Sequence, residues 1–242
     1  HSFLIGLQFL TRLKLEKQTV WTAQDFGRSV KFFPLVGLVV GLVWAVVYYV
    51  GRHFLPSYVL AAVLVVSHLV ITGGLHVDGF MDTADGIFSG RSRERMLEIM
   101  KDSRVGANGV MAFGVLLLLK WSLLLDMPGW HLPEALVIAP MVGRMAMVIG
   151  IIKFPYARPE GIGKAFAEHA EKRSLYIATA YTAITVAAVG LTAVYAALAA
   201  VAVAWAFARY ITRLLGGLTG DVYGAITELA ELCVLFMFVL LA

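Results

Sequence analysis

Apolar residues in this chain come in long blocks that contain almost no charge, rather than in short alternating stretches. Several blocks approach the roughly 17 to 25 residues that a helix needs to cross a hydrocarbon core of about 30 Å. Windows free of charge predict seven crossings, near residues 32–50, 57–72, 110–125, 134–152, 175–190, 192–208 and 229–242. We therefore expect an all-α fold, a polytopic integral membrane helical bundle in which residues 1–242 form a single membrane-embedded domain.

The composition excludes a soluble enzyme as the default class. The 242 residues are 60% hydrophobic and only 15% charged, and their mean hydropathy is +0.82. A net charge of +4 and a pI near 9.2 raise the question of nucleic acid binding. In a membrane protein, however, excess Lys and Arg usually record topology, so no nucleic acid partner is expected.

The basic residues then test the seven-span interpretation. Four segments hold five, five, five and two of the 20 Lys and Arg residues: 1–31, which includes Lys17, then 73–109, 153–174 and 209–228. With seven crossings all four segments lie on one side, which the positive-inside rule identifies as the cytoplasm. This predicts a cytoplasmic N-terminus, an outer C-terminus and a cytoplasmic-side active site for soluble substrates.

A first cluster of acids follows the second predicted span, in segment 73–86. Asp78, Asp82 and Asp85 stand at i, i+4 and i+7, so on a helix they share one face. No Lys or Arg lies between residues 73 and 90, and unpaired carboxylates near lipid are costly, so a cation must balance them. With oxygen ligands only, and no clustered His or Cys, the pattern favours Mg²⁺, with Mn²⁺ as the alternative.

A second acidic cluster precedes the last predicted span. Asp221 and Glu228 are seven residues apart and share a helix face, and Glu231 follows about a turn later. Glycines recur every four residues beside them, at Gly216, Gly220 and Gly224. This small-xxx-small spacing lets helices approach closely in lipid, so the second cluster can reach the first.

Basic side chains that could bind an anion lie near these clusters. Ser92 can cap a helix running to about residue 104, with an apolar arc opposite a charged one, which predicts an interfacial amphipathic helix. The candidate substrate-binding residues are Arg91, Lys101 and Arg104 around that helix, Arg158 and Lys164 in the glycine-containing loop 153–164, and His76 beside the first acids. Arg144 lies within a predicted span and is expected to face a cavity or a carboxylate.

These motifs closely resemble the cobalamin synthase family, adenosylcobinamide-GDP ribazoletransferase. The likeness runs nearly end to end and is carried by segments 9–13, 33–37, 73–86, 93–106, 156–163 and 216–231. The resemblance implies a Mg²⁺-dependent integral protein of the bacterial or archaeal inner membrane. Its expected substrates are adenosylcobinamide-GDP and α-ribazole or its 5′-phosphate, joined late in coenzyme B12 biosynthesis with release of GMP.

The resemblance also assigns expected roles to the acids. Asp82, Asp85 and Asp221 would bind the metal that holds the pyrophosphate. A carboxylate must still take the proton of the attacking hydroxyl, and Glu228 is the first candidate because it shares the face of Asp221, with Asp78 as the second.

Two other functions remain open at this point. Asp82-x-x-Asp85-Gly86 and Gly217-x-x-x-Asp221 echo the signatures of CDP-alcohol phosphotransferases, which would keep the metal site and change the acceptor. A cation-coupled transporter would use intramembrane acids to bind its ion, although the acids here flank a predicted cytoplasmic loop. Membrane lipid is an expected contact, and the oligomeric state, a homo-oligomer included, stays open.

Overall fold

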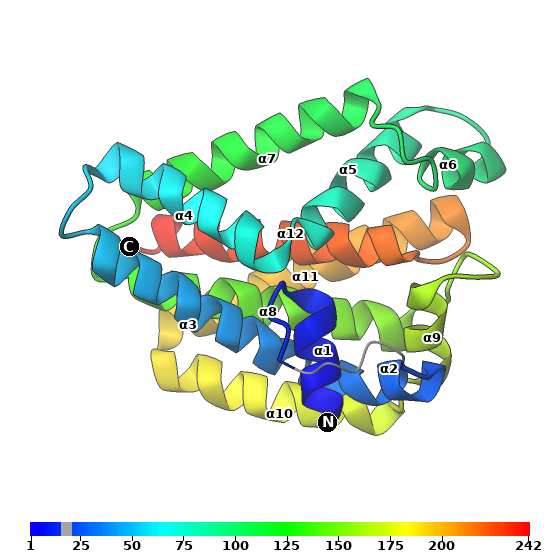
Figure 1. Cartoon of the computed structure of the whole chain (residues 1–242), viewed down its shortest axis with the longest axis horizontal. Coiled ribbons are helices and arrows are strands. Elements are labelled where there is room, and N and C mark those ends of the chain that lie inside the picture. Colours follow the sequence, from blue (N-terminus) through cyan, green and yellow to red (C-terminus); the bar gives the residue numbers. More distant parts are fainter. Residues whose placement is uncertain (16–20) are drawn as a thin grey trace.

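The computed structural model describes residues 1–15 and 21–242, so Lys17 lies outside the described residues. Within these ranges the chain forms helices and a single isolated β-bridge, between Tyr156 and Leu218 (Figure 1). The helices are α1 (Ser2–Leu10), α2 (Ala23–Ser29), a 3-10 turn η1 (Val30–Phe32), α3 (Phe33–Gly51), α4 (Ser57–Thr72), α5 (Leu75–Phe88), α6 (Arg93–Ile99), α7 (Ala107–Asp126), α8 (Leu132–Lys153), α9 (Ile162–His169), α10 (Lys172–Val189), α11 (Leu191–Leu215) and α12 (Gly220–Leu240). The predicted all-α class is confirmed for the described residues.

The centre of the bundle is α8, which contacts α3, α10, α11 and α12. A helix that is apolar on every side is expected to be buried, and most of α8 is. Small residues allow α3 to lie close against it: a Cβ at Gly37 would stand 2.3 Å from the carbonyl oxygen of Pro140. This close approach of backbones is typical of helix pairs in lipid.

The second predicted span, 57–72, coincides with α4, and a second helix follows it after a sharp bend. Helices α4 and α5 meet at an angle of 92° across Gly73 and Gly74. Both glycines have positive φ, 65° and 70°, a conformation that costs other residues energy. The break is tied to the segment after α1, because the backbone N–H of Arg12 donates to the carbonyl of Ile71 at 2.8 Å. As a result α5 leaves the line of α4 and reaches α12, as Figure 1 shows.

Aromatic rings hold the N-terminal helices against α9. Phe166 of α9 lies edge-on to three other rings, with centroids 5.1 to 5.4 Å apart. Its partners are Phe9, Phe26 and Phe33. Edge-to-face pairs of this kind add to the stability gained by burying the rings. These ring contacts join α9 to α1, α2 and α3.

The structure supports fewer crossings than the seven predicted. Five helical segments are long and apolar enough to cross a membrane, and six if the bent α4 and α5 pair is one span. The predicted span 175–190 coincides with α10, which is not among them. The helix that contains the predicted last span begins before residue 229, at Gly220, where Thr219 caps α12 by accepting the N–H of Val222. The second acidic cluster therefore lies on a helix that is long and apolar enough to cross a membrane.

The predicted amphipathic helix is confirmed but shorter than expected. Ser92 caps α6 as predicted, since its Oγ accepts the N–H of Arg95, and the helix ends at Ile99. Met96 and Met100 are buried, whereas Glu94 is exposed. In Figure 1, α6 and α9 lie at one end of the bundle and the C-terminus lies at the other.

We predict that the end carrying α6 and α9 faces the cytoplasm. In a Cys233→Ala background, single cysteines at His53 and Trp130 should react with a membrane-impermeant maleimide added to intact cells. Cysteines at Arg91 and Lys164 should react only after the membrane is opened. Equal labelling of positions 91 and 130 in intact cells would contradict this topology.

Candidate active site

The three acids of α5 have different surroundings, although they stand on one helix as predicted. Asp85 is buried, and its two oxygens accept the backbone N–H groups of Gly106 and Gly109 at 2.8 and 2.7 Å. These amides open α7, where a negative charge offsets the helix dipole. Both oxygens of Asp85 are therefore engaged in hydrogen bonds with the start of α7. This does not favour the predicted role of Asp85 as a metal ligand.

The other acids gather where α5 crosses α12. A Cβ at Gly79 would stand 2.6 Å from the carbonyl oxygen of Asp221, and one at Gly224 would stand 2.8 Å from that of His76. Glycine at both positions lets the backbones touch, as the glycine spacing predicted for α12. Asp82 is then close enough to Asp221 to interact electrostatically, and Asp78 interacts with both carboxylates. The two acidic clusters do meet.

Arg158 supplies a positive charge to this group. It comes from the loop after α8, and its guanidinium lies 2.7 Å from a carboxylate oxygen of Asp221. Both side chains are largely buried, with 17% and 22% of their area exposed. An ion pair that is partly shielded from water is screened less than a surface pair. Arg158 is therefore held beside the acids rather than free in solvent.

Two cavities open beside these residues. The smaller cavity, of about 250 Å³, is bounded by α1, α5, α8, α9, α12 and the loop after α8. Its polar lining includes His76, Asp78, Tyr156, Arg158, Asp221 and Tyr223. The wider groove, of about 920 Å³, lies at the bend between α4 and α5, has a largely apolar lining, and carries Arg12 and Lys14. Phe9, Leu75 and Asp78 line both spaces, so the two meet at Asp78.

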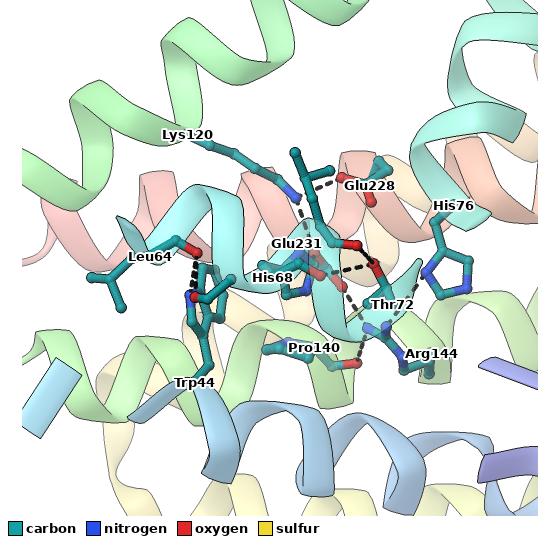
Figure 2. Close-up of polar contacts among 12 residues, drawn as sticks. Trp44, Leu64, His68, Thr72, His76, Lys120, Pro140, Arg144, Glu228 and Glu231 are labelled. Carbon is teal, nitrogen blue, oxygen red and sulfur yellow. Dashed lines mark hydrogen bonds and ion pairs between the residues drawn. The ribbon is translucent and has the colours of Figure 1, made fainter. Parts of the chain in front are cut away.

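Further into the bundle, four charged side chains form a buried ion cluster (Figure 2). Lys120 of α7 lies 2.5 Å from Glu228 and 3.1 Å from Glu231. Arg144 of α8 lies 2.5 Å from the other oxygen of Glu231, as expected for a mid-span arginine. Each of the four is at most 3% exposed. Two cations balance two carboxylates, which makes burial of the charges tolerable.

The buried ion cluster changes the interpretation of Glu228. It shares the Asp221 face of α12 as predicted, but that face enters the core, where Glu228 is 1% exposed and bonded to Lys120. It lines neither cavity. This position does not favour Glu228 as the general base. Asp78, the second candidate, is exposed and lines both cavities.

Of the six candidate substrate-binding residues, two reach the smaller cavity, namely His76 and Arg158. Arg91 and Lys101 are exposed around α6 and line neither cavity. Arg104 donates hydrogen bonds to Asp102, which lower the pKa of the Asp102 carboxyl to about 2. Lys164 donates to the carbonyl of Pro159 at 2.7 Å and likewise lines neither cavity.

Several residues of the site escaped the sequence interpretation. Arg12, Tyr156 and Tyr223 fall within the recognised motifs, but nothing in their spacing predicts a cavity wall. Burial raises the pKa of the Tyr156 hydroxyl, which stays protonated at neutral pH. Arg93 donates from Nε to the carbonyl of Leu215 at 2.7 Å and ties α6 to the end of α11.

Comparison with known proteins gives consistent matches over the whole length. The family described as Cobalamin-5-phosphate synthase matches residues 2–239. A relative from Desulforamulus reducens, named adenosylcobinamide-GDP ribazoletransferase, is 42% identical over 244 residues, covering 99% of this chain and 96% of its own. A relative of the same name from Acetivibrio thermocellus is 36% identical over 239 residues, covering 98% and 96%. No solved structure matches the chain.

The buried ion cluster predicts a strong effect of removing one partner. Lys120→Met leaves Glu228 charged and unpaired in the core, which should lower the free energy of unfolding by about 3–5 kcal/mol. Adding Glu228→Gln should restore much of this loss, because the unpaired charge is gone. Equilibrium unfolding in detergent measures the free energy of unfolding of both variants.

The matched control is Arg95→Met, which removes the exposed Arg95 and Glu98 pair and should change stability little. A Lys120→Met variant as stable as the unaltered protein would contradict the cluster.

Proposed function

The chain belongs to the Cobalamin-5-phosphate synthase family, and on this premise we propose that it joins adenosylcobinamide-GDP to α-ribazole or its 5′-phosphate at the two cavities that meet at Asp78. The products are adenosylcobalamin, or its 5′-phosphate, and GMP. The relatives are named for this transfer, and they cover almost all of this chain.

One geometric observation supports this placement. A transfer between two large molecules needs two binding spaces that open at one point, and the smaller cavity and the wider groove share Asp78. Asp82 and Asp221 interact beside that point, and Arg158 is held against Asp221. A reaction that attacks a pyrophosphate needs such opposite charges close together, because both the substrate and its leaving group are anionic.

Mg²⁺ fits this donor set. Among the described residues no three His, Cys, Asp or Glu side chains form a ready metal site. Mg²⁺ is nevertheless commonly held by one or two carboxylates together with substrate phosphates. Asp82 and Asp221 would hold the ion, with Mn²⁺ as a substitute, and the bound ion would offset charge on the phosphoryl oxygens.

The residues of the chain then have separate tasks. Arg158 counters negative charge near Asp221, and the smaller cavity positions a polar part of the substrates. The hydroxyl oxygen of the ribazole bonds to the cobinamide-side phosphorus, and the bond from that phosphorus to the GMP oxygen breaks. Asp78 accepts the hydroxyl proton, because it faces both spaces.

Neither alternative function is favoured. A CDP-alcohol phosphotransferase would keep the metal site and change the acceptor, whereas the relatives that cover almost all of this chain are named for the ribazole transfer. A transporter would need its ion site at the acids of the core, and there Lys120 and Arg144 already balance Glu228 and Glu231. We further propose that residues 1–242 work as one domain of the inner membrane, with the cavities on its cytoplasmic side.

The direct test measures GMP released from adenosylcobinamide-GDP by the purified protein in detergent. Release should require both α-ribazole, or its 5′-phosphate, and Mg²⁺. Release in the absence of an acceptor would indicate hydrolysis rather than transfer, and undiminished release in EDTA would remove the metal from the proposal.

Substitutions should separate the metal ligands from the proton acceptor. Asp82→Asn and Asp221→Asn should each lower the rate at least about a hundredfold, because several kcal/mol of charge stabilisation are lost, and raised Mg²⁺ should rescue part of it. Asp78→Asn should lower the rate roughly 10²- to 10⁴-fold without rescue by Mg²⁺.

Asp126→Asn, at the far end of α7, is the matched control and should leave the rate unchanged. If Glu228→Gln, correctly folded, lost the chemical step while Asp78→Asn kept it, the assignment of the proton acceptor would return to Glu228.

A further inference from the structure

Three side chains that line the smaller cavity carry buried polar atoms without a hydrogen-bond partner among the described residues. These atoms are Nε2 of His76, the hydroxyl of Tyr223, and Nε and Nη2 of Arg158. His76 and Tyr223 are only 2% and 3% exposed. Leaving a buried polar group without a hydrogen bond costs free energy, so such groups usually bond to a ligand or to water.

Arg144 of the buried ion cluster determines which ring nitrogen of His76 carries the proton. The guanidinium of Arg144 lies 3.4 Å from Nδ1 of His76, as Figure 2 shows. A guanidinium can only donate, so Nδ1 accepts and the neutral ring carries its proton on Nε2. Arg144 is itself held by Glu231 and by the carbonyl of Pro140. His76 therefore presents an N–H donor to the cavity.

The backbone around the smaller cavity also favours an anion. Three helices, α5, α9 and α12, begin at the cavity wall, where Leu75, Ile162 and Gly220 line it. The start of a helix carries partial positive charge and attracts anions. Arg158 adds a full charge and neutralises Asp221, one of the two acids in the wall.

We propose that the smaller cavity is a phosphate-binding subsite, in which Nε2–H of His76 and the hydroxyl of Tyr223 donate to phosphate oxygens beside Arg158. The ligand is a phosphate or diphosphate group. Within the proposed function, on which this assignment rests, it comes either from the diphosphate of adenosylcobinamide-GDP or from the 5′-phosphate of the acceptor. Arg144 is a positioning residue that orients His76.

Calorimetric titration of the full chain in detergent with inorganic pyrophosphate and Mg²⁺ tests the subsite without turnover. Tyr223→Phe and His76→Met should each weaken pyrophosphate binding roughly tenfold, because each removes one hydrogen bond to a charged group. His76→Gln should recover part of the affinity, since its amide can place a donor near the position of Nε2. Tyr223→Phe removes only an unbonded hydroxyl, so it should fold normally.

Two matched controls should bind pyrophosphate normally. His68 lies next to Glu231 and lines neither cavity, so His68→Met removes a buried histidine outside the proposed subsite. Tyr48→Phe removes a hydroxyl at the opposite end of the bundle. Thermal unfolding verifies that every variant is folded. Unchanged pyrophosphate affinity and unchanged KM values in folded Tyr223→Phe and His76→Met would overturn the subsite.

The KM values identify the source of the phosphate. If the variants raise KM for α-ribazole 5′-phosphate and not for α-ribazole, the subsite holds the acceptor phosphate. If they raise KM for adenosylcobinamide-GDP with either acceptor, it holds the donor diphosphate. Because pyrophosphate binding needs no reaction, a protein that binds it as proposed but releases no GMP would refute the proposed function and leave the subsite standing.

Discussion

The site depends on the close crossing of α5 and α12. Gly79 and Gly224 remove the side chains that would otherwise separate the two helices, and each lies against backbone of the other helix. This contact brings Asp82 towards Asp221 and places His76 over α8. A methyl group at either glycine would have to displace backbone, which cannot yield as a flexible side chain can. The approach of Asp82 to Asp221 therefore depends on two glycines.

A second constraint fixes where α12 lies. Its Glu228 and Glu231 bond to Lys120 of α7 and Arg144 of α8, so pairing of buried charges holds three helices together. The same helix begins with Asp221 at the smaller cavity. The buried ion cluster thus acts as a structural anchor about two turns from the proposed chemistry. Through Arg144 it also sets the orientation of His76, which joins the anchor to the cavity.

The sequence predicted the helical class, the shared face of the acids on α5 and the approach of the two acidic clusters, because these follow from local periodicity and glycine spacing. It also predicted that Arg144 faces a cavity or a carboxylate, and the structure shows the carboxylate of Glu231. It could not predict that Asp85 accepts the amides at the start of α7, since this depends on how loop 100–106 folds back. Nor could it place Glu228 in the core, because the depth of a helix face depends on packing against α7 and α8. Nor could it predict the angle of 92° at which α4 and α5 meet across Gly73 and Gly74, because that angle depends on the tertiary structure.

The most direct measurement of the central claim is an anomalous diffraction map of crystals grown with Mn²⁺ and pyrophosphate. We expect a manganese peak between the carboxylates of Asp82 and Asp221, with pyrophosphate density extending into the smaller cavity towards His76, Tyr223 and Arg158. A manganese peak at Asp85 or at the Glu228 and Glu231 pair, with none between Asp82 and Asp221, would contradict the account.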